Sequence, residues 1–330
     1  LGRVAQAGPA LGYRNKLRLW RSPTGQYGVR RKGSHDVLAI DRHGLMPDLF
    51  NDEVLPFLLT LPPADEAVAR LDGQGGFLLS LFGPPGRLRA LKAVLKDLPA
   101  GEAPHPACVG ILYNNRPAWG RDHLLVKTAG RTFRVNAGSF FQVNYAEAAA
   151  AVSLARGWLD EAGVTADAPG GALADLFCGV GLFAACLGDR FARVIGVEND
   201  ERAVRDARNN LLRDRRTGDE VEVVCADAAA VLARWREGDW RDGDLRYKAP
   251  DWPLATVVLD PPRTGLGDAA AAILAALGPA RIIYMSCDPA TLARDSATLA
   301  AGGYGLARAR VIDMFPQTSH VECLAELVRR

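Results

Sequence analysis

The chain has 330 residues, of which 48% are hydrophobic and 24% charged, which is typical of a folded globular protein with room for two domains. No apolar run approaches the ~20 residues of a membrane span, so the composition excludes an integral membrane protein. The six cysteines include no Cys-x-x-Cys pair, which excludes the usual zinc patterns, and we expect reduced thiols, no bound metal and a cytoplasmic location.

The net charge of +2 is unevenly distributed along the chain. Residues 1–135 contain 19 Lys and Arg against 11 Asp and Glu, whereas residues 136–330 contain 21 against 27. The first 32 residues hold eight basic side chains and no acidic one, with Tyr13, Trp20 and Tyr27 between them. Basic groups interleaved with aromatic rings suit phosphates and stacked bases, so this stretch is either an RNA-binding surface or a solvated basic face.

The first part of the chain predicts a small α+β domain over residues 1–135. Strand-like alternation occurs at 16–20, 27–30 and 37–40, and turn residues at 22–25 predict a hairpin between the first two runs. Apolar spacing predicts helices over 48–61 and 85–98, and residues 107–135 return to strand-like patterns. An Ala-rich helix is predicted over 145–162, followed by a polar connector at 164–171.

Regular β/α alternation begins at residue 172, and we assign residues 136–330 to a second domain. Strands are predicted at 172–177, 193–198, 221–225, 255–260 and 281–286, which indicates a mostly parallel sheet covered on both faces. The last two strand-like runs, 307–314 and 321–328, are too close together for a crossover helix, so they should be antiparallel. A doubly wound sheet with this end is typical of class I methyltransferases rather than dehydrogenases. Residues 237–253 should form a surface insertion.

A strand that runs into a Gly-rich turn predicts a nucleoside-binding site. The run Leu173–Gly181 supplies Gly179 and Gly181, which allow a tight turn and close approach of a ligand, but Ala184 replaces the third glycine of a dinucleotide fingerprint. Seventeen residues after Gly181, a second strand ends on Glu198, where an acid can bind ribose hydroxyls. The alternative is a turn with only a structural role.

Two further strands end on chemically active side chains. The run Thr256–Arg263 ends on Asp260 before two prolines, so this carboxylate should face the ligand-binding edge of the sheet, unless it only caps the next helix. The run Arg281–Pro289 ends on Cys287, which could act as a nucleophile or be a small buried hydrophobic residue.

Several motifs together resemble the RNA uracil-C5 methyltransferases of the 23S rRNA type. They are Gly12–Lys16, Ser139–Asn144, Asp175–Gly181, Asp260–Arg263, Ser286–Pro289 and Phe315–Glu322, which span nearly the whole chain. The resemblance implies that Cys287 is the nucleophile and Glu322 the base. It also implies contacts with S-adenosylmethionine from Gln142, Phe177, Gly179, Gly181, Glu198, Asp227 and Asp260. The role of His320 stays open between orienting Glu322 and a surface polar group, and that of Arg263 between binding the substrate and a plain ion pair.

The chain departs from the family pattern in three respects. Leu182 stands where the family usually has Asn. Many members bind a 4Fe–4S cluster through four cysteines, but no cysteine precedes Cys108 and His43 stands about where the fourth ligand would be, so we expect no cluster. We also identify no N-terminal oligonucleotide-binding domain, and the chain lacks an initiator Met. It is therefore either truncated or from a cluster-free branch.

The sequence thus predicts a monomeric 5-methyluridine synthase that uses S-adenosylmethionine and acts on RNA, with ribosomal RNA as the expected substrate. The target base would be flipped out between the two domains. One alternative is a tRNA-directed member of the same family. The other is a non-catalytic RNA-binding or assembly factor that has kept the fold, which the intact Cys287 and Glu322 disfavour.

Overall fold

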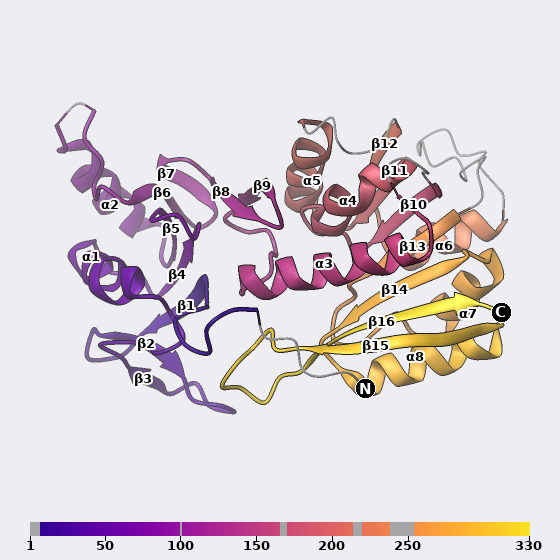
Figure 1. Cartoon of the computed structure of the whole chain (residues 1–330). Coiled ribbons are helices and arrows are strands. Elements are labelled where there is room, and N and C mark those ends of the chain that lie inside the picture. Colours follow the sequence, from indigo (N-terminus) through magenta and orange to yellow (C-terminus); the bar gives the residue numbers. More distant parts are fainter. Residues whose placement is uncertain (1–6, 100, 166–169, 214–219, 238–253) are drawn as a thin grey trace.

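The computed structural model describes residues 7–99, 101–165, 170–213, 220–237 and 254–330 (Figure 1). An N-terminal lobe and a C-terminal lobe lie side by side, and helix α3 (Tyr145–Glu161) runs from near their junction along the C-terminal lobe. Within the described ranges, no helix is both long enough and apolar enough to cross a membrane.

The N-terminal lobe is built on one seven-stranded sheet in the order β3-β2-β1-β4-β5-β6-β7. The strands are β1 (Lys16–Arg21), β2 (Tyr27–Arg30), β3 (Val37–Ala39), β4 (Glu66–Leu71), β5 (Phe77–Phe82), β6 (Cys108–Tyr113) and β7 (Arg116–Gly120). A π-helical turn (Phe50–Val54) leads into α1 (Leu55–Thr60), and α2 is Gly86–Lys96. The predicted hairpin, the helices and the α+β architecture are confirmed.

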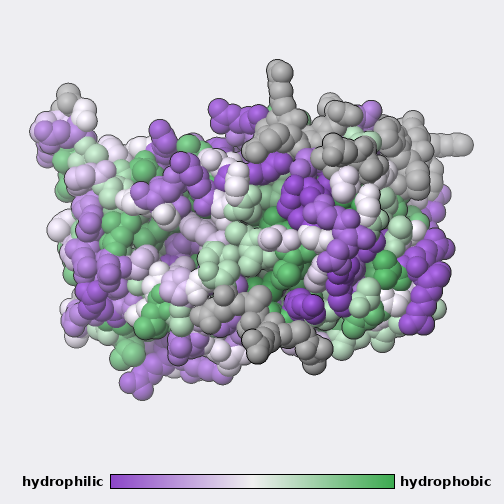
Figure 2. All heavy atoms as spheres, in the orientation of Figure 1, coloured by the Kyte–Doolittle hydropathy of each residue, from purple (hydrophilic) through white to green (hydrophobic). Residues whose placement is uncertain are grey.

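Strand β1 separates the core of this lobe from a face that carries basic side chains, the basic face of β1. Leu17 and Leu19 are buried in one cluster with residues of α1 and α2. Because side chains alternate along a strand, Lys16, Arg18 and Trp20 lie on the other face, where they are exposed or half-buried. Figure 2 shows hydrophilic residues along the outer left edge of this lobe.

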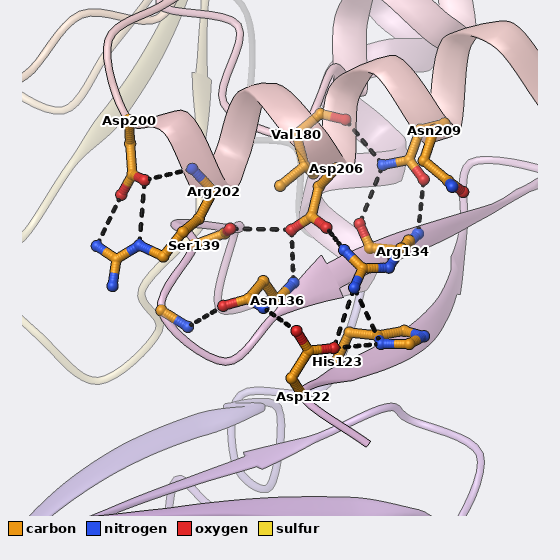
Figure 3. A network of polar contacts seen from close by, with 12 residues as sticks. Asp122, His123, Arg134, Asn136, Ser139, Val180, Asp200, Arg202, Asp206 and Asn209 are labelled. Atoms are coloured by element: carbon orange, nitrogen blue, oxygen red, sulfur yellow. Dashed lines mark hydrogen bonds and ion pairs between the residues drawn. The ribbon is translucent and has the colours of Figure 1, made fainter. Parts of the chain in front are cut away.

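The hairpin β8 (His123–Thr128) and β9 (Arg131–Asn136) packs on the C-terminal lobe through a buried polar network (Figure 3). Arg134 forms an ion pair with Asp206 of helix α5 (Glu201–Arg213). Asp206 also accepts hydrogen bonds from the backbone N–H of Asn136 at 2.6 Å and from Ser139 Oγ at 2.9 Å. From the N-terminal lobe, the buried Arg70 donates to the carbonyl of Ser139 at 2.5 Å. These hydrogen bonds hold the segment that follows β9 against both lobes. The predicted domain boundary between residues 135 and 136 stays a prediction.

The C-terminal lobe contains a second seven-stranded sheet in the order β12-β11-β10-β13-β14-β16-β15. Its strands are β10 (Gly170–Leu176), β11 (Phe191–Glu198), β12 (Glu220–Cys225), β13 (Leu254–Leu259), β14 (Arg281–Ser286), β15 (Tyr304–Ile312) and β16 (Glu322–Arg329). The helices are α4 (Leu182–Leu187), a 3₁₀ turn (Gly188–Arg190), α5 (Glu201–Arg213), α6 (Ala228–Glu237), α7 (Asp268–Leu277) and α8 (Pro289–Ala301).

Both faces of this sheet are covered, as predicted for a doubly wound fold. Along β10, Leu173 belongs to the core cluster with α3, α4 and α5, whereas Ala172 and Ala174 belong to the cluster with α6, α7 and α8. The strands from β10 to β14 pair in parallel, and β16 pairs antiparallel with both β14 and β15. The class I methyltransferase architecture is confirmed. The predicted insertion, apart from residue 237, and residues 166–169 of the predicted connector lie outside the described residues.

Candidate active site

In the turn between β10 and α4, three alternate residues have a left-handed backbone conformation. Phe177, Gly179 and Gly181 have φ of 62°, 56° and 86°. A side chain there costs roughly 1 kcal/mol or more, so Phe177 is strained, a feature that clusters at functional sites. A Cβ added to Gly181 would meet Leu211 at 3.3 Å, whereas at Gly179 nothing lies within 4 Å. Gly181 is thus needed for packing as well as for the turn, and the space beside Gly179 is open for a ligand.

The carboxylate of Glu198 is oriented toward this turn by backbone donors. Its Oε2 accepts from the N–H of Gly179 at 2.9 Å, and its Oε1 from the N–H groups of Asn199 at 2.8 Å and Asp200 at 2.9 Å. The parallel register of β10 and β11, which pairs Leu176 with Val197, brings the two strand ends together. A carboxylate has about four acceptor positions, so Glu198 is held in place and can still accept from a ligand hydroxyl.

Asp260 lies beside the same turn, at the end of β13. Its Oδ2 accepts a hydrogen bond from Nε2 of the buried Gln142 at 3.0 Å. Burial and, less strongly, the negative charge of Glu198 raise the pKa of Asp260 to about 7, although the hydrogen bond from Gln142 acts in the opposite direction. The side chains of Gln142, Glu198 and Asp260, which lie far apart in sequence, are therefore brought into one site.

Asp175 is a third acid beside this turn, and the sequence did not single it out as a site residue. It is 1% exposed, its Oδ2 accepts from the N–H of Ala184 at 2.8 Å, and its Oδ1 has no partner among the described residues. Burial raises its pKa to about 8, and the charges of Asp260 and Glu198 add to the shift. The only sequence signal was its position as first residue of the Asp175–Gly181 motif, and its inward orientation follows from tertiary packing.

Asp227 lies just after β12, next to the end of β11. The N–H of the preceding Ala226 donates to the carbonyl of Glu198 at 3.0 Å. The exposed carboxylate of Asp227 accepts from the N–H of Ala230 at 3.0 Å and so caps α6. Its predicted contact with the cofactor stays a prediction.

Cys287 and Glu322 meet at the ends of two neighbouring antiparallel strands. Ser286, the last residue of β14, pairs with Cys323, so Cys287 comes opposite Glu322, the first residue of β16. Glu322 is 3% exposed and Cys287 is half-buried. No group within the described ranges donates a hydrogen bond to the Glu322 side chain, so burial and the nearby charge of Asp260 raise its pKa to about 8.

The surroundings of Cys287 are acidic apart from one arginine. Burial and the charges of Glu322 and Asp260 raise the pKa of this thiol, while the guanidinium of Arg263 lowers it. Nη2 of Arg263 lies 3.3 Å from Nδ1 of the exposed His320, whose ring contacts Phe315 edge-on at 5.7 Å. The polar side-chain partner of His320 is therefore Arg263. Among the described residues, no hydrogen bond joins His320 to Glu322.

Leu182, which stands where the RNA uracil-C5 methyltransferases usually have Asn, is an apolar residue of the core. Leu182, the first residue of α4, is 6% exposed and belongs to the cluster that includes Phe183 and Leu211. His43, which we considered as a cluster position, accepts a hydrogen bond at Nδ1 from the N–H of Leu45. Among the described residues, no group of three or more His, Cys, Asp or Glu side chains is arranged to bind a metal ion, and the expectation of no iron–sulfur cluster stays a prediction.

Comparison with known proteins points to one family. Residues 118–330 match the model of the tRNA (uracil-5-)-methyltransferase family. An uncharacterized RNA methyltransferase of Streptomyces coelicolor is 32% identical over 97% of this chain and 64% of its own length. A 23S rRNA (uracil(1939)-C(5))-methyltransferase of Pseudomonas aeruginosa is 32% identical over 96% of this chain and 68% of its own. The chain spans about two thirds or less of the length of most of the curated relatives it matches.

The fold also matches a solved structure over almost its whole length. The crystal structure of a Pyrococcus abyssi tRNA (uracil-54, C5)-methyltransferase in complex with S-adenosyl-L-homocysteine covers 98% of this chain and 77% of its own, with a TM-score of 0.69. Sequence identity between the two is 22%, so the similarity is one of fold.

Proposed function

We propose, since the chain belongs to the tRNA (uracil-5-)-methyltransferase family, that it methylates carbon 5 of a uridine in RNA with S-adenosylmethionine as methyl donor. The observation that carries the proposal is the meeting of Cys287 and Glu322 at paired strand ends, beside Asp260 and the Gly-rich turn. This arrangement joins a nucleophile, a base and a nucleoside-binding turn in one site.

The residues of the Gly-rich turn fit S-adenosylmethionine. Glu198 is held by three backbone donors and can still accept from a ribose hydroxyl, and the space beside Gly179 admits a ligand close to the backbone. Asp175 has one buried carboxylate oxygen without a partner, which could accept from a bound cation or N–H group. When bound, the cofactor supplies an electrophilic methyl group on a positively charged sulfonium, and the acidic surroundings favour a cation.

Cys287 would activate the uracil ring by covalent addition. Carbon 5 of uracil is a poor nucleophile, but addition of a thiolate to C6 moves the electron pair of the C5–C6 double bond onto an enolate, which makes C5 nucleophilic. Because burial and two carboxylates raise the pKa of Cys287, the free enzyme holds mostly the thiol. The positive charge of Arg263 lowers the pKa of Cys287 and so favours the thiolate form.

Glu322 would complete the reaction as the base. After C5 has gained the methyl group, its proton must leave so that the electron pair can re-form the C5–C6 double bond and expel the Cys287 thiolate. A buried carboxylate with a pKa raised to about 8 is a stronger base than an ordinary glutamate. Its position opposite Cys287 suits a proton on the carbon adjacent to the thioether carbon.

Ribosomal RNA is our proposed substrate, supported by the Pseudomonas relative named as a 23S rRNA methyltransferase, which aligns with 96% of this chain. The fold match to a tRNA methyltransferase makes tRNA the second candidate. A non-catalytic RNA-binding role fits less well because Cys287, Glu322 and Asp260 are all present and brought together. We propose that the protein acts in the cytoplasm as a monomer.

The test uses RNA that contains either uridine or 5-fluorouridine, incubated with the protein and S-adenosylmethionine. Wild type should form 5-methyluridine, detected by mass spectrometry, and should form a covalent adduct with the fluorinated RNA, since fluorine at C5 cannot leave as a proton. Cys287→Ala should do neither while still binding cofactor.

Cys108→Ala provides the matched control, because this thiol is buried in β6 of the other lobe and should be dispensable for both products. Substantial 5-methyluridine formation by Cys287→Ala would show that the nucleophile lies elsewhere. A comparison of rRNA with tRNA as substrate decides between the two RNA classes.

A further inference from the structure

The segment Gly12–Lys16, whose last residue begins β1, has two chemically different sides. Tyr13 and Asn15 are 8% and 5% exposed, whereas Arg14 and Lys16, which alternate with them, are half-buried. In Figure 1 this N-terminal stretch lies beside the loop that joins β15 to β16, which reaches from the C-terminal lobe toward the N-terminal lobe. The buried side of the segment therefore faces the loops of the candidate active site.

Tyr13 holds the loop that carries Glu322. Its hydroxyl donates to the carbonyl of Pro316 at 3.0 Å in a buried contact between residues 303 positions apart. Asn144 holds the same loop at the carbonyl of Met314 at 3.5 Å. Residues 317–321, between these anchors and Glu322, are exposed. No group of the described residues donates a hydrogen bond to the Glu322 carboxylate. The position of Glu322 therefore depends on the pairing of β16 with its neighbouring strands and on the two hydrogen bonds that hold the preceding loop.

Asn15 holds the segment that carries Gln142. Its side-chain Nδ2 donates to the carbonyl of Gln142 at 2.9 Å, and its backbone N–H donates to the carbonyl of Val143 at 2.9 Å. Gln142 in turn donates to Asp260. The N-terminal lobe is thereby connected to the cofactor side of the site through two consecutive hydrogen bonds.

The alternate residues, Arg14 and Lys16, lie in a cluster of basic side chains. Lys16 pairs across the sheet with the fully buried Arg70, whose Nε has no partner in the described structure. Burial, together with the positive charges of Arg70, Arg18 and Arg14, lowers the pKa of Lys16 to about 7. Arg18 is paired with Glu66, but no carboxylate of the described residues pairs with Lys16, so this position is suited to a phosphate of an RNA backbone.

We infer that Tyr13 and Asn15 are positioning residues of the active site, and that Arg14 and Lys16, on the opposite side of the same five residues, bind an RNA phosphate. Tyr13 positions the Glu322 loop and therefore acts on removal of the C5 proton. Asn15 positions Gln142 and therefore acts on cofactor binding. The inference rests on the proposed function for the identity of these two steps.

The experiment separates the two steps with RNA that carries tritium at C5 of uridine and cofactor that carries a ¹⁴C-labelled methyl group. Tyr13→Phe keeps the ring and removes one hydrogen bond, so tritium release should fall about fivefold relative to methyl incorporation, and a methylated protein–RNA adduct should accumulate. Asn15→Ala should weaken cofactor binding by roughly fivefold in calorimetry and leave the tritium-to-methyl ratio unchanged. Arg14→Gln should raise KM for RNA alone.

Tyr113→Phe is the matched control, since its hydroxyl donates to the carbonyl of Pro84 at 2.8 Å inside the N-terminal lobe. It should alter neither readout. If Tyr13→Phe lowers tritium release and methyl incorporation in equal proportion, or leaves both at wild-type levels, the positioning role of Tyr13 is refuted. If wild type binds cofactor but releases no tritium, the proposed reaction fails, while the calorimetry of Asn15→Ala still decides whether Asn15 positions Gln142.

Discussion

At the scale of single residues, the ends of the predicted strands located most of the site. Glu198, Asp260 and Cys287 each follow an apolar run, and in a parallel sheet such positions meet at one edge. The contacts of Tyr13 and Asn15 could not be predicted in this way. They join residues 303 and 127 positions apart, and no local pattern encodes a contact between two lobes.

Glu322 allows a prediction about catalysis and pH. In the free enzyme its pKa is about 8, so the fraction present as a base grows as the pH rises through that value. We expect kcat/KM of wild type to increase from pH 6 to about 8. Glu322→Gln should lower turnover by about 10²–10⁴-fold and trap a methylated adduct with RNA, measured by gel shift after denaturation. Wild-type turnover by this variant would place the base elsewhere.

Thermal unfolding of the same variant provides an independent control. The unfolded chain ionises Glu322 near its ordinary pKa of 4.5, whereas the folded protein keeps it protonated to about pH 8. The folded state therefore loses stability as the pH rises through this window. Because glutamine cannot ionise, the Tm of Glu322→Gln should exceed that of wild type by a margin that widens between pH 5 and pH 8. A constant difference would contradict the buried position of this carboxylate.

At the scale of secondary-structure elements, the sequence predicted which segments form strands and helices better than how these elements pack together. The short connection between the last two strands required β15 and β16 to be antiparallel, as observed. Glu322 lies opposite Cys287 for a different reason, the antiparallel pairing of β16 with β14, which the sequence did not specify. The packing of β8 and β9 on α5 was not predictable, because it depends on the buried pair of Arg134 with Asp206, residues 72 positions apart. Likewise, a helix was predicted over 48–61, but its apolar spacing did not distinguish the π-helical turn Phe50–Val54 from the α-helix that follows it.

Strand β6 carries the prediction about iron. Cys108, the first cysteine of the chain, is buried in this strand, and burial raises its pKa to about 12, so it is held as a thiol. Cluster ligands are thiolates, usually four together. Anaerobically purified protein should therefore be colourless and contain no stoichiometric iron by elemental analysis. A broad absorbance near ~400 nm with bound iron would refute this expectation.

At the scale of the whole molecule, the charges separate between the two parts of the chain. Residues 1–135 have eight more basic than acidic side chains, and residues 136–330 have six more acidic than basic ones. The residues proposed to bind the cofactor lie in the acidic part, whereas Lys16, Arg18 and Trp20 lie on the basic face of β1 in the other part. Arg30 stacks over Trp20, with its guanidinium carbon 4.6 Å from the ring centre. This separation suits a protein that binds a cationic cofactor in one lobe and a polyanion on the other.

The final prediction concerns the strength of RNA binding at different salt concentrations. Each phosphate contact with a single strand should add about 0.7 to the slope of log K against log salt. Arg14→Gln, Lys16→Gln and Arg18→Gln together should weaken RNA binding and lower that slope by roughly 2, because three cations are removed. Neutral replacements are preferable to acidic ones, since Arg18 already pairs with Glu66 at 3.1 Å.

Lys16 adds a pH dependence that distinguishes a phosphate contact from a solvated face. With a pKa of about 7, it loses its charge in the free protein as the pH rises, so RNA binding above pH 7 must take up a proton and should weaken toward pH 8.5. Lys16→Gln should remove this dependence while cofactor affinity, measured in parallel, stays at the wild-type value. If the dependence of RNA binding on salt and on pH is the same in the triple variant and in wild type, the basic face of β1 does not contact RNA. Other basic groups of the N-terminal part, such as Arg116, Arg121 and Arg131, would then have to bind the substrate.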